Sequence, residues 1–375
     1  MRISVEARAA RREHARRLRV ADVALFYGAR TGGIRTYLDA KARYAARTGA
    51  FEHHVIVPGR HERHTGNRHE LRSLSLAASN GYRLPLGSGS LKTTLRDIRP
   101  DAVLLHDPWW ASVGVTRLAH ELDAAVLAFH HASCELEAEG LPGPSALYKT
   151  GLRAWFRHAW SEADGVVSAV DPGPDSGRTA AFPLRFGVDP VFRPPARAPR
   201  RGDHVLYAGR LAREKGLFEL LEATAAAPDP WPLRIVGAGP AAGAIAARVD
   251  ALGLSERVSF HPFASDRGVL ARMYAEAACV VMPGAYETFG FVTLEAAASG
   301  ARVVACARAP SASLVGSLAD TFAPGDRDGL LAAIERARRR APDLAAAREL
   351  AATFTWDRAI SSELADLSRL VRAAP

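Results

Sequence analysis

The sequence predicts an α/β protein in which two domains are each built on a parallel β-sheet. Short, continuous apolar runs alternate with helical patterns, as in sheets that are covered on both faces. This alternation occurs twice, once on each side of a Pro- and Arg-rich segment at residues 192–201 that indicates a linker. The 375 residues, 48% of them hydrophobic, are enough for two cores of ordinary size.

In the first half of the chain, apolar runs mark five strands. The first, at residues 21–27, is followed by a Gly-rich loop at 28–33 and a helix at 34–46, the order that opens an α/β domain. The other strands of this half are expected at residues 52–58, 101–106, 124–129 and 164–170. We place the first domain at residues 21–192.

Histidines are concentrated around the second of these strands. Five of the thirteen lie within seventeen residues: His53, His54, His61, His64 and His69. Their spacing fits no standard pattern of metal ligands. We therefore interpret the polar segment at residues 61–70 as an irregular surface loop, and we predict no metal site.

The second half of the chain repeats the order of strand, turn and helix. Strands are expected at residues 204–208, 233–236, 257–261, 278–282 and 301–305. Helices are expected to end near residue 226 and to span residues 291–298 and 329–339. We place the second domain at residues 193–355, followed by a terminal helical segment at 356–375.

The charge of the chain is unevenly distributed. The formal net charge is +9, and residues 1–20 hold seven arginines against Glu6 and Glu13. This basic extension suits an anionic membrane surface or an anionic acceptor. A solvated extension without a role explains it equally well. Nucleic acid is not expected as a partner, because no basic patch interleaved with aromatic residues follows.

Composition also limits where the protein acts. No apolar run approaches the roughly 20 residues of a membrane-spanning helix, and no apolar segment of a signal peptide follows the charged N-terminus. The scattered cysteines, Cys134, Cys279 and Cys306, suit a reducing compartment. We expect a cytoplasmic protein, with peripheral contact to the inner face of the membrane as an open alternative.

The stretch from residue 282 to residue 300 carries the strongest functional signal. Pro283-Gly284 ends the apolar strand, and Phe289-Gly290 turns the chain into the helix at 291–298. Unpaired backbone N–H groups and the helix dipole make the start of such a helix an anion site. The sequence therefore predicts that a phosphate binds here.

Two carboxylates, Glu287 and Glu295, frame this predicted phosphate site. A carboxylate beside a phosphate is repelled, so its presence needs another reason. A sugar supplies one, because a carboxylate can accept hydrogen bonds from two neighbouring hydroxyls. We interpret Glu295 as the contact to a nucleotide ribose and Glu287 as the contact to a second sugar beyond the phosphates.

The spacing Glu287-x7-Glu295, with Phe289-Gly290 between the two acids, resembles the signature of retaining glycosyltransferases of family 4. The resemblance covers about residues 21–372. It implies the GT-B fold, with two Rossmann-like domains facing a central cleft. It also implies retaining, metal-independent transfer of a sugar from a nucleoside-diphosphate sugar to a glycan, lipid-linked or small-molecule hydroxyl, without a cofactor.

The resemblance assigns roles to further residues. Arg210 and Lys215 are implied to hold the donor diphosphate, and His130, or else His131, to face the donor sugar. With Glu287 these form the expected catalytic set of His130, Arg210, Lys215 and Glu287. The expected donor-binding set is Gly32, Gly33, Phe263, Thr288, Phe289, Gly290, Phe291 and Glu295.

Three features depart from this picture or compete with it. Gly237-x-Gly239 follows a strand, as in dinucleotide-binding proteins, but no acidic residue ends the next strand, so we interpret an ordinary turn. Asp326 and Asp328 form a D-x-D sequence, which we interpret as a helix cap. Leu184-Arg185-Phe186 stands where the family usually has a single Asn before Gly-Val-Asp.

Other functions remain open at the level of sequence. A nucleotide-sugar epimerase or a phosphorylase could use the same scaffold. From other classes, an NAD-dependent dehydrogenase acting through Gly237 and Gly239, and a glycan-binding protein without activity, are alternatives. The donor base and sugar, the acceptor, the linkage and the oligomeric state are not specified by any motif.

Overall fold

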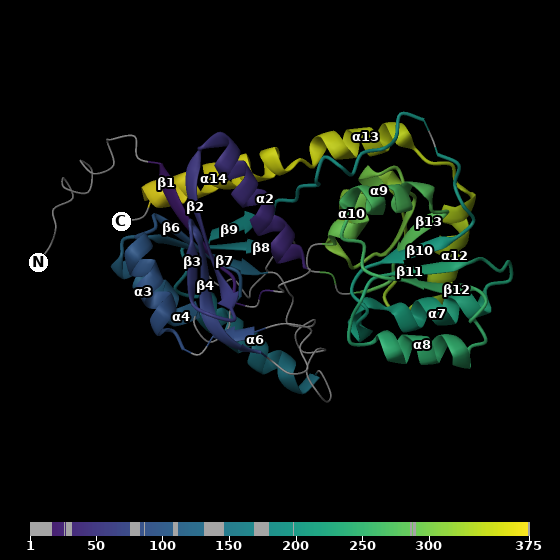
Figure 1. Ribbon diagram of the computed structural model, residues 1–375, viewed down its shortest axis with the longest axis horizontal. Helices are drawn as coiled ribbons and strands as arrows, with labels where there is room; N and C mark the ends of the chain where they lie inside the picture. Colours follow the sequence, from purple (N-terminus) through teal and green to yellow (C-terminus); the bar gives the residue numbers. More distant parts are fainter. Residues whose placement is uncertain are drawn as a thin grey trace, which may run out of the picture.

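The computed structural model contains two α/β domains joined by a linker, which runs from residue 184 to residue 204, and by a C-terminal helix that returns to the first domain (Figure 1). The residues that the structure describes are 17–25, 27, 32–75, 83–85, 87–107, 112–130, 146–168, 180–197, 199–285, 287 and 290–373. Each domain has its own sheet, and the expected pair of parallel-sheet domains is confirmed.

The first domain has the strand order β3-β4-β2-β1-β6-β7-β8-β9, with β5 paired to β4. Among the described strands, only the pairs β3–β4 and β4–β5 are antiparallel. The strands are β1 (Leu18–Val23), β2 (Phe51–Gly59), β3 (Arg63–Thr65), β4 (Arg68–Ser75), β5 (Arg83–Pro85), β6 (Ala102–Leu105), β7 (Ala125–His130), β8 (Gly165–Ser168) and β9 (Ala180–Pro183). The helices described here are α2 (Gly33–Thr48), α3 (Gly89–Ile98), α4 (Ser112–Glu121) and α6 (Ala146–Trp160).

The second domain has a fully parallel sheet with the order β12-β11-β10-β13-β14-β15. Its strands are β10 (Val205–Ala208), β11 (Leu233–Val236), β12 (Val258–His261), β13 (Cys279–Met282), β14 (Val303–Cys306) and β15 (Ala319–Phe322). Its helices are η2 (Arg213–Lys215), α7 (Leu217–Ala226), α8 (Ala242–Ala251), α9 (Arg267–Glu276), α10 (Phe291–Ala298), α11 (Pro310–Leu314), η3 (Gly316–Leu318), α12 (Arg327–Arg339) and α13 (Leu344–Thr353). Figure 1 shows α7 and α8 on one side of the sheet and α9 and α10 on the other.

None of the helices in the described ranges is both long enough and apolar enough to cross a lipid bilayer.

The first strand begins at residue 18 and not at the predicted residue 21. Leu18 and Val20 are in parallel register with β2, so the apolar pattern of the sheet starts with them. Arg19, between them, is fixed by polar contacts: its side chain lies 3.0 Å from the Glu52 carboxylate, and its backbone N–H donates to Asp101 at 2.7 Å. The end of the predicted basic extension therefore belongs to the sheet, and residues 1–16 lie outside the described part of the chain.

The polar segment at residues 61–70 is not an irregular loop, as predicted, but a hairpin that continues the sheet. Gly66, with a φ of 55°, makes the tight turn between β3 and β4. Along β4 buried and more exposed residues alternate, with His69 and Leu71 buried. Histidine takes an inward position there, which is why a hydrophobicity pattern did not reveal the strand.

The histidines of this hairpin bond to each other and to His54 of the neighbouring strand β2. His69 lies between two of them, with ring nitrogens 3.0 Å from His54 and 2.9 Å from His64. The far nitrogen of His54 is 2.9 Å from Glu52. Burial and the two neighbouring imidazoles lower the pKa of His69 to about 4, so its ring is neutral near pH 7. Within the described ranges, no group of residues is arranged to hold a metal ion.

The helix α14 (Trp356–Ala373) lies against the first domain (Figure 1). A buried cluster of charged side chains joins the two. Lys41 of α2 is fully buried, and its Nζ lies 3.0 Å from Asp22 of β1 and 2.6 Å from Glu363 of α14. Tyr37 donates to the other oxygen of Glu363 at 2.5 Å. Lys41 and two histidine hydrogen bonds hold the pKa of Asp22 well below its ordinary value, against the opposing effect of burial.

We expect Lys41→Ala to destabilise the protein by about 3 kcal/mol or more, because it leaves two buried carboxylates without their cation. Urea unfolding at neutral pH measures this loss. The control is Arg47→Ala on the same helix, which breaks an exposed pair with Asp357 and should cost less than about 1 kcal/mol. Equal losses of unfolding free energy in the two variants would show that the buried contacts of Lys41 do not stabilise the fold more than an exposed ion pair does.

Candidate functional site

The predicted strand–turn–helix is present at the carboxyl end of β13. The strand ends at Met282 and α10 begins at Phe291, as the sequence indicated. Gly290 is the N-cap of α10 and has a φ of 60°. A Cβ at this position would lie 2.0 Å from Ser311 Oγ. Only glycine therefore fits this turn, and the start of α10 is packed tightly against α11.

Lys215 and Glu287 meet at the carboxyl ends of β10 and β13. The Lys215 Nζ lies 2.9 Å from Glu287 Oε1, and the two side chains are only 18% and 10% exposed. The loops that carry them touch through Gly216, where a Cβ would lie 2.7 Å from the backbone of Pro283. Two residues 72 positions apart (287 minus 215) are thus brought into one polar site.

Arg210 lies in the same loop as Lys215 but has a different partner. It forms an ion pair with Glu214, and about a third of its side chain is exposed. Its backbone carbonyl accepts a hydrogen bond from the buried Tyr207 hydroxyl at 2.8 Å. The two cations predicted to hold a diphosphate are therefore both at this edge of the sheet, each beside a carboxylate.

Glu295 is buried within α10 and pairs with a residue that sequence reasoning did not select. Arg267, the first residue of α9, donates from Nη2 to Glu295 Oε1 at 2.6 Å. Burial raises the pKa of Glu295 to about 7, and Arg267 opposes that rise. A carboxyl that titrates near neutral pH is typical of functional sites. No local pattern marks Arg267, because its partner lies on another helix.

The side chain of Phe291, at the start of α10, packs against rings outside the second domain. Its ring packs against Phe186 of the linker, with centroids 6.2 Å apart, and against Trp356 of α14 at 5.6 Å. The Phe291 side chain is thus part of the contact between the domains.

Of the remaining predicted site residues, the structure describes some and not others. Gly32 is the N-cap of α2 with a φ of 135°, and Gly33 begins that helix. Phe263, half exposed, follows β12. His130 ends β7, but its side chain, and all of His131, Thr288 and Phe289, lie outside what the structure describes.

The two competing motifs have structural explanations. A Cβ on Gly237 would lie 1.9 Å from the Gly209 carbonyl oxygen, and one on Gly239 would lie 2.2 Å from that of Leu211. These glycines let two neighbouring loops run side by side. Asp326 is the N-cap of α12 and accepts from the Gly329 N–H at 2.8 Å, so its predicted capping role is confirmed.

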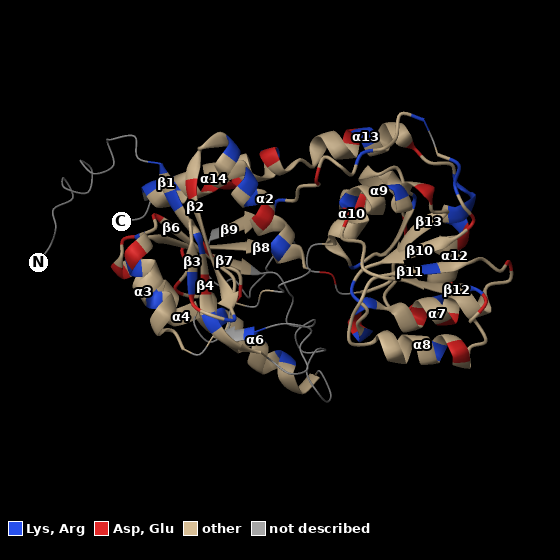
Figure 2. Ribbon diagram, in the orientation of Figure 1, with Lys and Arg blue, Asp and Glu red and all other residues tan. Residues whose placement is uncertain are grey.

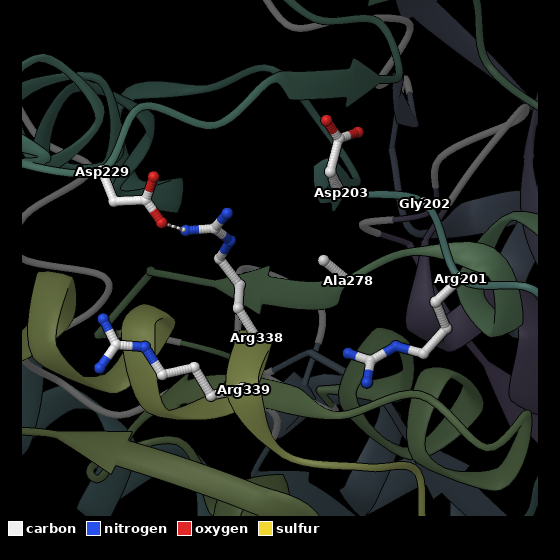
Figure 3. Close-up of a pocket in the computed structure, with 7 residues that line it drawn as sticks. All are labelled: Arg201, Gly202, Asp203, Asp229, Ala278, Arg338 and Arg339. Atoms are coloured by element: carbon white, nitrogen blue, oxygen red, sulfur yellow. Dashed lines mark hydrogen bonds and ion pairs between the residues drawn. The ribbon is translucent and has the colours of Figure 1, made fainter.

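A cavity of about 210 Å³ lies at the opposite edge of the second sheet, before β10 and β13. Its lining residues are Arg201, Gly202, Asp203, Asp229, Ala278, Arg338 and Arg339 (Figure 3). Arginines gather here along the linker and at the end of α12 (Figure 2). Arg338 contacts both Asp229 and Glu335, at 3.5 and 3.2 Å, so much of this charge is balanced within the protein.

We expect Gly290→Ala to destabilise the protein more than Gly316→Ala does. Both glycines have a left-handed backbone, which costs an alanine roughly 1–2 kcal/mol. A Cβ on Gly316 meets no atom within 4 Å, whereas one on Gly290 collides with Ser311. Thermal unfolding of the two variants measures the difference. Equal destabilisation would mean that the contact with Ser311 does not constrain the start of α10.

Two family models match the chain. The model described as "Glycosyltransferase Family 4" matches residues 31–169, in the first domain. The model described as "Glycosyl transferases group 1" matches residues 190–349, in the second. Together they span most of the chain.

Curated relatives agree with these matches. The chain is 31% identical over 391 residues to a GDP-mannose-dependent alpha-(1-6)-phosphatidylinositol dimannoside mannosyltransferase of Mycobacterium tuberculosis, covering 94% of this chain and 97% of the relative. It is 36% identical over 211 residues to a D-inositol 3-phosphate glycosyltransferase of Mycobacterium avium, covering 50% and 48% of the two chains.

Solved structures show the same fold. Sucrose-phosphate synthase from Thermosynechococcus elongatus superposes with a TM-score of 0.74 at 22% identity, covering 96% of this chain and 100% of the other. Alr3699/HepE of Anabaena, solved with UDP and glucose, gives 0.72 at 17% identity, covering 94% and 99%. The chain therefore belongs to glycosyltransferase family 4, within the group 1 glycosyl transferases, and has the GT-B fold.

Proposed function

We propose that this glycosyltransferase moves mannose from GDP-mannose to a hydroxyl of a lipid-linked glycan, with retention at the anomeric carbon and without a catalytic metal ion. The pairing of Lys215 with Glu287 at the carboxyl ends of β10 and β13 carries the proposal. It joins a cation suited to a diphosphate with an acid suited to sugar hydroxyls.

The departing diphosphate is the main charge that such a reaction must stabilise. Lys215, Arg210 and the N–H groups at the start of α10 supply positive potential at one edge of the sheet. Preorganised donors of this kind contribute roughly 3 kcal/mol each to catalysis in other enzymes. On this proposal, side chains and backbone N–H groups stabilise the negative charge that a metal ion stabilises in other enzymes of phosphate chemistry.

Glu295 is suited to bind the ribose of the donor. Arg267 occupies its Oε1, and among the described residues nothing donates to Oε2. That oxygen can therefore accept from ribose hydroxyls. Glu287 would then contact the transferred sugar, with His130 as the expected partner on the first domain.

Mannose and a lipid acceptor are proposed because of the relative that matches along nearly the whole chain. Its name specifies GDP-mannose as donor and a phosphatidylinositol dimannoside as acceptor. Among the three acceptor classes that the sequence left open, this favours the lipid-linked one. Retention is proposed from the resemblance of Glu287-x7-Glu295 to the signature of retaining enzymes.

A dehydrogenase is a weaker alternative because the structure explains its motif otherwise. Gly237 and Gly239 lie against the backbone of Gly209 and Leu211, where any side chain would collide. The Gly-x-Gly pattern thus serves packing between loops and gives no support to nicotinamide binding.

Assays with GDP-mannose, UDP-glucose and ADP-glucose against mannosylated phosphatidylinositol test the proposal. We expect transfer from GDP-mannose, undiminished by a chelator, with an α-linked product by NMR. Product formed without an acceptor would instead indicate an epimerase or a hydrolase. A β-linked product would contradict retention.

We expect Lys215→Ala and Arg210→Ala each to lower kcat/KM about a hundredfold, because each removes one charge from the departing diphosphate. Steady-state assays with the proposed donor measure the loss, and circular dichroism checks the fold. Arg213→Ala is the matched control, since Arg213 is an exposed cation of the same loop, packed over Phe218. Near-normal turnover in Lys215→Ala or Arg210→Ala would count against a diphosphate clamp.

We expect donor affinity to fall as the pH drops below about 7, the pKa to which burial raises Glu295. Protonation removes the charged acceptor of the ribose hydroxyls, so the deprotonated form binds best and affinity rises with pH. Calorimetry with GDP-mannose, whose diphosphate diester does not titrate near neutral pH, measures this. Glu295→Gln should bind weakly at every pH, and an unchanged pH profile in that variant would refute the role of Glu295.

A further inference from the structure

Arg267 lies where the donor-binding helix meets the linker between the domains. Asp266 caps α9 by accepting from the N–H groups of Gly268 and Val269, which fixes Arg267 in the first turn. From there its guanidinium reaches Glu295 of α10 at 2.6 Å and stacks 4.6 Å above the ring of Phe192. Arg267 is therefore held by packing as well as by charge.

The contacts of Arg267 continue towards the first domain. Its Nε lies 3.9 Å from Asp189 of the linker, and the same carboxylate lies 3.6 Å from Arg43 of α2. Charges of alternating sign thus run from Glu295 in the second domain to α2 in the first. The link to Arg43 is exposed and contributes little. In the link between Arg267 and Glu295, the Glu295 side chain is only 8% exposed, whereas that of Arg267 is 37% exposed.

Arg267 is the cation closest to Glu295. Tyr274, also on α9, is buried beside it without a hydrogen-bond partner among the described residues. Asp189 adds negative charge and raises the pKa of Glu295 further. The adjacent α11 carries no titratable residue, and Arg348 of α13 donates to linker carbonyls instead. Removing Arg267 would leave burial and Asp189 to favour the protonated form of Glu295.

We propose that Arg267 is a positioning residue for donor binding: it holds Glu295 as an oriented carboxylate whose Oε2 receives the ribose hydroxyls. This inference rests on the proposed role of Glu295 in binding the nucleotide. A purely structural role, in which Arg267 only joins α9, α10 and the linker, is the competing explanation. The two differ in how donor affinity should depend on pH.

The test is calorimetric binding of GDP-mannose between about pH 6 and about pH 8.5 to the full-length protein and its variants. Arg267→Ala should weaken binding about tenfold at pH 7 and shift the midpoint of the pH profile upward by about one unit, so that affinity recovers at high pH. Arg267→Lys should restore most of the affinity and the original midpoint. In turnover assays the loss should appear in KM more than in kcat.

Arg272→Ala is the matched control, because Arg272 is an exposed arginine of the same helix. It should leave the pH profile unchanged. If Arg267→Ala lowers affinity by the same factor at every pH, or leaves it unchanged, the inference is overturned and Arg267 is structural. If the wild-type protein binds no nucleotide sugar, or Glu295→Gln binds as wild type does, the proposed function of the site fails instead.

Discussion

The arrangement of the two domains depends on the buried contact of Lys41 with Asp22 and Glu363. These three residues come from β1, α2 and α14, and α14 follows the whole second domain in sequence. Two carboxylates share one cation in a largely buried site, so removing Lys41 leaves both acids without it. The contact fixes α14 against the first domain. Because the second domain lies between α2 and α14 in sequence, its two ends must both return to the first domain.

The two segments that cross between the domains meet beside α10. Val188 of the linker pairs with Thr355, just before α14, and its N–H donates to the Phe354 carbonyl at 2.8 Å. Phe291 of α10 packs against aromatic rings from both crossing segments. Glu295, one turn later, is joined to the linker through Arg267. Helix α10 is therefore in direct contact with both segments that cross between the domains.

Local sequence patterns predicted most helices and strands. They did not predict which side chains pair with one another across different elements. The strand ending at Met282 and the helix beginning at Phe291 follow from an apolar run, a Pro-Gly break and a Phe-Gly turn, all within a few residues. Arg267 and Lys41 could not be selected in this way, because their functional partners lie on other elements. The strand at residues 68–75 was missed because His69 occupies an inward position where the pattern calls for an apolar residue.

The cations of the candidate site are already paired with carboxylates in the folded protein: Lys215 with Glu287, Arg210 with Glu214, and Arg267 with Glu295. Bringing a lone lysine into a partly buried site would cost several kcal/mol in lost hydration. Here Glu287 offsets that cost before any diphosphate arrives. A bound diphosphate would replace Glu287 as the anion beside Lys215. Glu287 could then accept hydrogen bonds from sugar hydroxyls. The same pair can thus stabilise the fold and, on the proposed function, link phosphate binding to recognition of the sugar.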